Sequence, residues 1–386
     1  MSISCYLHTS VYVNTHTREI YTTNKRLYRN CQLTMMKPTV VIDLGTGRTK
    51  AGLAEEEYPS CNIPTVISAD DSYIVGDEAL QQGHYVYPLK HGVIQNFDHM
   101  EILFDHIFEK ELHIQPEGHP ILLTQIPKNP QKDKERLAEM IFEKYDAPAL
   151  YEEVNSVLTF YSSGRPAGLI VESGHGVTSV VPILSGYAIS EAIMRLDIGG
   201  RDIDKYLVKL LVDKSYYNIR PEEAQLIKEN MCSIPDSKQL IDEKEIYVLP
   251  DGTDILLGDE KYHAGDPLFD PALIEQYDCP GIHEMVFQSI FKCGLDLRRE
   301  FANNIILSGG NTLFNGFENK LKQEVEARVP QSMKVNVVAD KDRLYYVWRG
   351  GSILGSLSTF CKNICVSRQE YEEFGMPIVR KKCNGL

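Results

Sequence analysis

"TVVIDLGTGRTKAGL" (residues 39–53) and "GLIVESGHGVTSVVPI" (residues 168–183) share one plan. In each, an apolar run leads into an acidic residue, two glycines one residue apart and a second strand-forming run. This pattern predicts a strand, a tight glycine turn and a second strand. Such a turn presents consecutive backbone N–H groups to a phosphate, because glycine adopts the required dihedral angles and has no Cβ in the way. Two copies predict a duplicated fold whose halves face each other and clasp one polyphosphate.

Outside these stretches the chain alternates between strand and helix patterns, which favours an α/β architecture. The apolar segment from Pro120 predicts a buried strand, and apolar residues at helical spacing after Asp133 predict a helix that this aspartate caps. A second helix is expected in residues 152–163, ended by Gly164. A third glycine-rich segment, LSGGNTLF from Leu307, opens a helix and offers its N-terminus to a nucleoside or a phosphate.

Length and composition set the class of protein. A chain of 386 residues forms two domains or one large two-lobed unit with a sizeable core. Its formal net charge of −14 argues against broad nucleic-acid binding, and we expect no direct nucleic-acid contact. No apolar run approaches the roughly 18 residues of a membrane helix, so no membrane span is expected. Nine scattered cysteines are typical of reduced thiols in a cytosolic or nuclear protein.

The first 38 residues differ from the rest of the chain. They hold five basic residues and one acidic residue, Glu19, and they are rich in Thr, Tyr and Asn. They lack the continuous apolar core of a secretory signal. We therefore predict a basic and flexible N-terminal extension over residues 1–38.

Further segments make the pattern specific to one family. In chain order, the following resemble segments of the actin family: DLGTGRTKAG, YIVGDEA, ESGHGVT, LDIGGRDI, LSGGNTLF and VWRGGSILGSLSTF. The resemblance covers almost the whole chain from Lys37 to Cys383. It implies the actin/Hsp70/hexokinase-type fold, in which two α/β lobes with duplicated phosphate-binding hairpins enclose a central nucleotide cleft. It places residues 39–162 plus 346–386 in the small lobe and residues 163–345 in the large lobe.

The resemblance also implies a nucleotide, ATP or ADP, with Mg²⁺ or Ca²⁺ in the cleft. Asp43 and Glu172 match the acids that hold the metal through water, as suits a hard cation that keeps its waters. Lys50 matches the residue that offsets charge on the β- and γ-phosphates, and Leu344 stands where the family has a lysine beside the base. The residues expected to bind the nucleotide are Gly45, Thr46, Gly47, Lys50, Gly174, Gly176, Val177, Gly200, Lys228, Glu229, Gly309, Gly310 and Phe314.

The positions that match the family's hydrolytic residues have changed. Breaking the terminal phosphate bond needs a positioned water, a group that orients it and a route for its proton. Of the two catalytic positions, Asn155 stands where the family has a glutamine, and His175 replaces an acid near the water. Ser179 replaces a histidine of the proton route, and Glu172 is one methylene longer than the family's aspartate. Because misplacement by about 1 Å is costly, these changes predict slow or absent hydrolysis. The alternative is retained activity with His175 accepting the proton, since imidazole titrates near neutrality.

Two surface segments bear on interactions. In the family, polymerisation depends on a long projecting loop, whereas the corresponding loop here, near residues 64–73, is short. Longitudinal filament contacts are therefore not expected. The resemblance also implies an apolar cleft in which amphipathic helices of partners dock. Its residues here are Tyr161, Gly164, Ile353, Leu354 and Leu357.

These observations predict an ATP-binding cytoskeletal or scaffold protein of the cytoplasm, an actin-related subunit of a complex with poor self-polymerisation. Actin or other actin-related proteins are the expected partners. Two alternatives stay open, a divergent filament-forming actin with ATPase activity and a nuclear actin-related subunit of a chromatin-remodelling complex. A sugar or acetate kinase of the same superfold has little support, because such kinases are not expected to match actin outside the phosphate turns.

Overall fold

The chain divides into two units, Met1–Lys37 and Pro38–Leu386, and the fold described below is that of the second. The computed structural model describes residues 37–70, 72–235, 244–274 and 278–383. The predicted extension over residues 1–38 therefore lies almost wholly outside the described residues.

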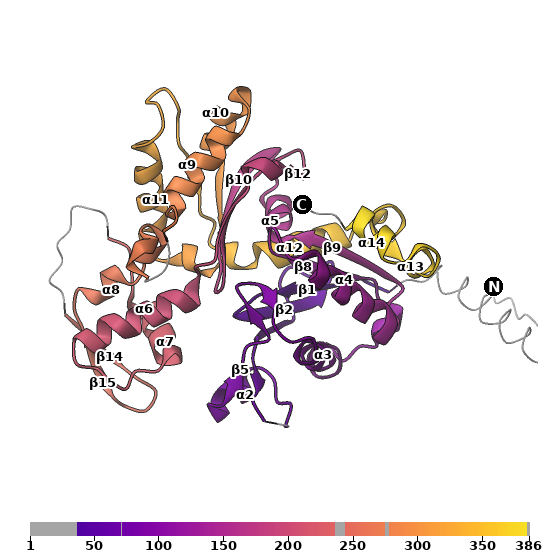
Figure 1. Cartoon of the computed structure of the whole chain (residues 1–386), viewed down its shortest axis with the longest axis horizontal. Helices are drawn as coiled ribbons and strands as arrows, with labels where there is room; N and C mark the ends of the chain where they lie inside the picture. The colour runs from indigo at the N-terminus through magenta and orange to yellow at the C-terminus, as the bar shows by residue number, and fades with distance from the viewer. Residues whose placement is uncertain (1–36, 71, 236–243, 275–277, 384–386) are drawn as a thin grey trace, which may run out of the picture. The chain divides into compact units, whose positions relative to one another are not determined.

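Strands and helices alternate along the described chain, so the predicted α/β class is confirmed (Figure 1). The strands are β1 Val40–Leu44, β2 Arg48–Leu53, β3 Cys61–Pro64, β4 Ile67–Ser68, β5 Tyr85–Val86, β6 Leu89–Lys90, β7 Val93–Ile94, β8 Ile121–Gln125, β9 Ala149–Val154, β10 Ala167–Ser173, β11 Thr178–Leu184, β12 Tyr187–Ala188, β13 Met194–Leu196, β14 Glu245–Val248, β15 Asp254–Leu257, β16 Ile305–Ser308, β17 Val337–Val338 and β18 Val366–Ser367. The α-helices are α2 Asp77–Gln82, α3 Phe97–His106, α4 Gln131–Glu139, α5 Asn155–Ser163, α6 Gly200–Asp213, α7 Pro221–Met231, α8 Glu260–His263, α9 Ile282–Lys292, α10 Leu295–Asn303, α11 Phe317–Glu326, α12 Tyr346–Gly355, α13 Arg368–Phe374 and α14 Met376–Lys382.

Two six-stranded sheets repeat the same central plan. The first has the order β18-β9-β8-β1-β2-β3, and the second has the order β12-β11-β10-β16-β17 with β13 paired to β11. In each, an antiparallel hairpin (β1–β2 or β10–β11) is joined by a parallel strand (β8 or β16) on its other side. The register places Asp43 opposite Lys50 and Glu172 opposite Ser179. The predicted strand–turn–strand repeat is therefore confirmed.

Helices α5 and α12 lie between the two sheets (Figure 1). Leu158 of α5 and Trp348 of α12 belong to an apolar cluster with Val41 of the first sheet. Phe160 of α5 belongs to another cluster, with apolar residues of β10, β11 and β16 of the second sheet. The two helices approach closely, because a Cβ on Gly350 of α12 would stand 1.8 Å from the carbonyl oxygen of Leu158. This packing joins the hairpins of the two sheets into one core.

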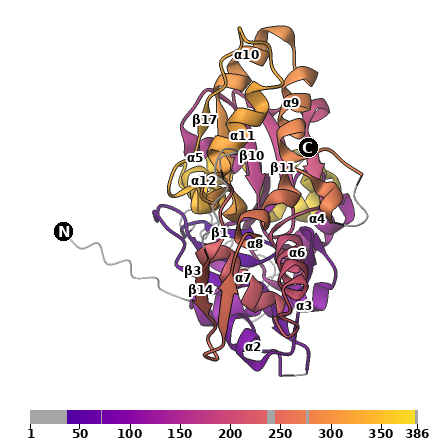
Figure 2. The same ribbon diagram turned by 90° about the vertical axis from the view of Figure 1, so that its left-hand side faces the viewer.

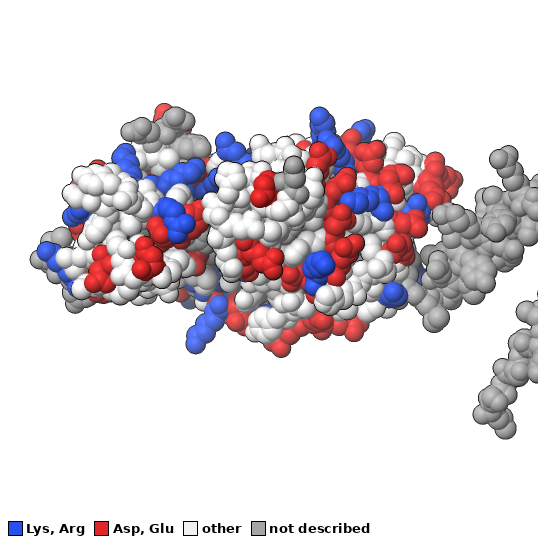
Figure 3. All heavy atoms as spheres, turned by 90° about the horizontal axis from the view of Figure 1, so that it is seen from below, with Lys and Arg blue, Asp and Glu red and all other residues white. Residues whose placement is uncertain are grey.

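Two smaller packing units complete the fold. Helices α9 and α11 pack their apolar faces on the second sheet. The hairpin β14–β15 packs against α6 and α7, and Figure 2 shows it beside these helices. Among the described residues, no helix is both long and apolar enough to cross a lipid bilayer. Acidic side chains lie over much of the face in Figure 3, with basic ones between them.

Two local predictions were wrong. Helix α4 begins at Gln131 with Pro130 at its N-cap, so Asp133 is not the cap. Asp133 is instead buried and accepts a hydrogen bond from the backbone N–H of Ile94 at 3.2 Å. Residues 152–154 belong to strand β9 rather than to the following helix, because pairing with β8 overrides their helical propensity. The predicted helix end at Gly164 is confirmed by its left-handed cap conformation.

Glu152 on β9 gives the protein a pH-dependent stability. It is 1% exposed and accepts a hydrogen bond from Gln125 Nε2 at 2.5 Å. Burial raises the pKa of this carboxyl to about 8, although Lys134 nearby opposes the rise. The folded state therefore holds a proton between pH 4.5 and 8 that the unfolded state has released, and its stability falls as pH rises through that window.

We accordingly expect Glu152→Gln to gain stability relative to the wild type by about 1.4 kcal/mol for each pH unit between pH 5 and 8. The measurement is the free energy of unfolding in denaturant across this range. Glu109→Gln, at an exposed position, is the control and leaves the wild-type slope unchanged. Parallel pH profiles for Glu152→Gln and the wild type would contradict the buried protonated carboxyl.

Candidate functional site

The two glycine turns lie face to face. A Cβ on Gly47 of the first turn would stand 2.6 Å from Cγ of His175 in the second. Reciprocally, a Cβ on Gly176 would stand 2.5 Å from Oγ1 of Thr46. Contacts this short exclude any side chain at the two glycines, so the close approach depends on both of them. The turns of the two hairpins thus meet, as the repeat in the sequence predicts.

The third glycine-rich segment and the start of α6 pack backbone to backbone on the second turn. Gly309, with φ +85°, would place a Cβ 2.3 Å from the carbonyl oxygen of Ser173. Gly199 would place one 2.5 Å from the carbonyl oxygen of His175. The N–H of Gly200 donates to the carbonyl of Gly174 at 3.0 Å. The glycine-rich segment at Gly309 and the start of α6 are therefore both fixed against the second turn.

Glycines 174 and 310 are less crowded than these, because a Cβ on either would meet one atom within 4 Å, at an ordinary contact distance. The nearest atom to a Cβ on Gly174 would be the carbonyl oxygen of Val177, at 3.8 Å. For Gly310 it would be Cδ1 of Leu344, also at 3.8 Å. Open backbone at both places leaves room for a ligand against the main chain. Leu344 thus lies next to Gly310, and its place beside the base stays a prediction.

An ion pair anchors the first hairpin. Lys50 Nζ lies 3.0 Å from Asp43 Oδ2, and both side chains are nearly buried. The other carboxylate oxygen, Oδ1, accepts a hydrogen bond from Thr124 Oγ1 at 3.0 Å. The same hydroxyl accepts from the backbone N–H of Leu44 at 3.0 Å. Thr124 thus orients Asp43, a role that sequence reasoning missed because β8 is distant in sequence from β1.

Asn311 is a second residue that sequence reasoning missed. Its Nδ2 donates to the carbonyl of Gly174 at 2.7 Å and to Oγ of Ser173 at 3.0 Å. Its side chain is buried and holds the second turn in place. The signal was its position in LSGGNTLF, directly after the glycine pair.

Glu172 and Asn155 form a buried pair with unused hydrogen-bonding capacity. Asn155 Nδ2 donates to Glu172 Oε1 at 3.2 Å. Glu172 Oε2 and Asn155 Oδ1 are both buried without a hydrogen-bond partner. Burial, with a further contribution from the charge of Asp43, raises the pKa of the Glu172 carboxyl to about 7. Orphaned polar atoms of this kind carry a cost that a bound ligand or water removes.

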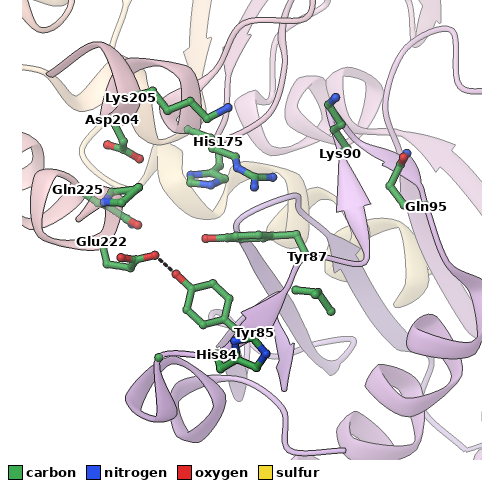
Figure 4. Close-up of a pocket in the computed structure, with 14 residues that line it drawn as sticks. His84, Tyr85, Tyr87, Lys90, Gln95, His175, Asp204, Lys205, Glu222 and Gln225 are labelled. Carbon is green, nitrogen blue, oxygen red and sulfur yellow. Dashed lines mark hydrogen bonds between the residues drawn. The ribbon is translucent and has the colours of Figure 1, made fainter. Parts of the chain in front are cut away.

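His175 lies in the second turn, between Gly174 and Gly176. Its ring stacks on Tyr87 with centroids 6.0 Å apart (Figure 4), and its Nε2 has no hydrogen-bond partner. Burial, together with the charges of Lys228 and Arg201, lowers the pKa of this imidazole to about 3. The expectation that the ring titrates near neutrality is therefore wrong for the site as it stands. A neutral imidazole with so low a pKa is a weak base.

Three more of the predicted nucleotide residues are Lys228, Phe314 and Glu229. Lys228 Nζ lies 2.7 Å from Asp204 Oδ1 in a buried ion pair and donates to the carbonyl of Gly200 at 3.3 Å. Phe314 is partly buried against the apolar cores. Glu229 is exposed and accepts a hydrogen bond from Gln225 Nε2 of its own helix, so its described contacts do not lead to the turns.

The residues around the turns fit a nucleotide with a divalent cation. Among the described residues, no group of three His, Cys, Asp or Glu side chains could hold a metal by itself. Mg²⁺, however, usually keeps several waters and takes only one or two carboxylates besides phosphate oxygens. Asp43 and Glu172 offer two carboxylates beside the turns, and Glu172 Oε2 lacks a partner. The open backbone at the glycine turns suits the phosphates.

The paired hairpins, the helices between the two sheets and the glycine-lined turns together define a two-lobed α/β protein. Comparison with models of protein families shows which family the chain belongs to. The model described as Actin matches residues 35–225 and 212–384. The chain therefore belongs to the actin family, whose members generally bind a nucleotide with a divalent cation.

Proposed function

We propose that this protein is an actin-related subunit of a cytoskeletal or nuclear complex that holds ATP with Mg²⁺ as a structural clamp and hydrolyses it slowly or not at all. The proposal takes residues 39–162 plus 346–386 and residues 163–345 as its two lobes. It rests on one observation above all. Asn155 and His175, which occupy the hydrolytic positions, are poorly suited to the reaction: the amide nitrogen of Asn155 donates to Glu172, and the imidazole of His175 is stacked on Tyr87 with a strongly lowered pKa.

Residues of both glycine turns and two carboxylates would bind the nucleotide and its cation. The ammonium group of Lys50 would offset charge on the outer phosphates, and the backbone N–H groups of both turns would hold their oxygens. Asp43 and Glu172 would hold the cation through its waters. When bound, the cation would neutralise part of the negative charge of the phosphates.

The hydrolytic positions offer only a weak base and a short amide. The amide nitrogen of Asn155 donates to Glu172, which leaves its Oδ1 as the one free group of this side chain. The imidazole of His175 is stacked on Tyr87 and has a strongly lowered pKa. Ser179, at 3% exposure on β11, offers a short hydroxyl where the family has a ring that relays protons. The alternative of an ATPase with His175 as its base receives no support from this geometry.

Restoring the family's side chains should restore hydrolysis. We expect the quadruple variant Asn155→Gln, Glu172→Asp, His175→Asp and Ser179→His to release phosphate from Mg-ATP at least about 100-fold faster than the wild type, the lower range for one general-base contribution. Single-turnover phosphate release measures this. His175→Asp alone guards against misfolding of the quadruple variant and should give part of the gain. A wild type that already hydrolyses ATP within minutes would overturn this half of the proposal.

Poor self-polymerisation is supported by the segment near residues 64–73. The N–H of Ser68 donates to the carbonyl of Ile74 at 2.8 Å, and the N–H of Ile74 donates to Ser68 Oγ at 3.0 Å. These bonds tie residue 68 to residue 74, so the stretch between them is short. It therefore offers no long loop to a neighbouring subunit. Robust filaments in a pelleting assay with Mg²⁺ and salt would contradict this part.

The proposed partner surface lies at the end of α12. Ile353 and Leu357 are 44% and 48% exposed, which suits contact with an amphipathic helix. Tyr161 is partly buried against the apolar clusters around α5 and α12, and Gly164 ends helix α5. Leu354, by contrast, is buried in the core between the sheets, so we assign it to packing rather than to the partner. Actin or another actin-related protein is the proposed assembly partner, and imaging of the tagged protein distinguishes a cytoskeletal from a nuclear complex.

A further inference from the structure

Two neighbouring pockets open beside the paired turns. The larger, of about 500 Å³, includes His175 and Tyr87 in its lining. The smaller, of about 200 Å³, is far larger than the space of one water. Its lining consists of Thr46, Lys90, His91, Gly176, Arg201, Asp202 and Lys205. Three cationic side chains, Lys90, Arg201 and Lys205, line both pockets.

The three cations converge from two elements. Lys90 ends strand β6, whereas Arg201 and Lys205 stand four residues apart on one face of α6. Figure 4 shows Lys205 and Lys90 on opposite sides of His175, with Lys205 extending toward the side of Lys90. The guanidinium carbon of Arg201 lies 4.3 Å from the centroid of the Tyr87 ring, which holds it in place.

Little negative charge opposes them. Among the described residues, neither Lys90 nor Arg201 has an ion-pair partner, and Lys205 Nζ reaches Asp202 Oδ1 only at 3.8 Å. Asp202 is the single acid in the smaller pocket, and its Oδ2 accepts the N–H of Gly199 at the start of α6. The smaller pocket therefore carries an excess of positive charge.

The acids of the larger pocket are also engaged elsewhere. Asp204 pairs with Lys228 at 2.7 Å, and Glu222 accepts the hydroxyl hydrogen of Tyr85. The positive potential acts on His175 as well, because Lys228, Arg201 and Lys205 add to burial in lowering its pKa. His175 Nε2 remains without a hydrogen-bond partner at this place.

We propose that Lys90, Arg201 and Lys205 form a second anion site, separate from the nucleotide, that takes a phosphate-class tetrahedral anion. Several charged donors around one cavity match the several oxygens of such an anion, and a guanidinium binds two of them at once. Thr46 adds a hydroxyl, whose oxygen already accepts the N–H of Gly92 at 2.9 Å and whose hydrogen is left to donate. Of the lining residues, only Thr46 and Gly176 also belong to the predicted nucleotide set.

Inorganic phosphate is the probe, and its ³¹P line broadening measures binding to the full chain with and without saturating Mg-ATP. We expect binding in the millimolar range in both conditions. Lys90→Gln and Lys205→Gln should each weaken it about tenfold, the effect of one charge-assisted hydrogen bond. Lys320→Gln, which removes a lysine paired with Glu324 on α11, is the matched control and leaves phosphate binding unchanged.

Two results would overturn the second site. One is equal phosphate binding by the wild type and both pocket variants. The other is loss of phosphate binding when Mg-ATP is added, which would assign the cations to the nucleotide's terminal phosphate. A chain that binds phosphate but no ATP would refute the proposed function while supporting the anion site, so the two failures are distinguishable.

Discussion

Replacing Gly309 with alanine is expected to lower the free energy of unfolding by about 3 kcal/mol and to abolish nucleotide binding. The added Cβ would stand 2.3 Å from the carbonyl oxygen of Ser173, a backbone atom that cannot turn aside. The φ of +85° adds strain for any residue other than glycine. The second turn must therefore shift, and its N–H groups lose their alignment. Denaturant unfolding and fluorescent-nucleotide titration measure the two effects.

Gly252→Ala is the matched control for this substitution. Its φ is +88°, but a Cβ there meets no atom within 4 Å. It should cost only the strain of the left-handed backbone, about 1 kcal/mol, and leave nucleotide binding intact. Equal losses of stability in the two variants would show that Gly309 is not held against the second turn.

Lys50→Met should weaken Mg-ATP binding on the order of 100-fold, since truncating one partner of a buried charge pair costs about 2–5 kcal/mol. The lysine is nearly buried, and its Nζ lies 3.0 Å from Asp43 Oδ2. Calorimetric titration with Mg-ATP gives the affinity. Lys320→Met, at a half-exposed helix pair with Glu324, serves as the control and changes the affinity little.

The single variant also leaves Asp43 buried without its cation, which destabilises the fold by about 3–5 kcal/mol. The double variant Asp43→Asn with Lys50→Met removes this unpaired charge and should recover stability without recovering ATP affinity. Recovery of both, or wild-type affinity in Lys50→Met, would exclude Lys50 from the phosphate site.

The repeated hairpin could be predicted from sequence because its signals are local. Strand pairing and the turn glycines follow from fifteen consecutive residues, and the structure adds the register that sets Asp43 opposite Lys50. The family resemblance then supplied the lobes and the cleft. The glycine at 309 was assigned to the nucleotide from the same resemblance, and the structure adds its tight contact with Ser173.

What the sequence did not predict depends on contacts between distant segments. Thr124 orients Asp43 from a parallel strand 81 residues away, and no local pattern marks it. The buried position of Asp133 follows from its bond to Ile94, which outweighs its preference for a cap. The low pKa of His175 arises from burial and from cations on helices α6 and α7. The ordinary pKa of imidazole therefore gave a wrong prediction for this residue.

The central claim is that the nucleotide is a clamp rather than a substrate. The most direct test loads the purified chain with Mg-ATP, removes the excess and quantifies bound ATP and ADP over hours by chromatography. We expect bound ATP to persist throughout, because the imidazole of His175 is a weak base and the amide nitrogen of Asn155 donates to Glu172. Conversion of the bound ATP to ADP within minutes would contradict it.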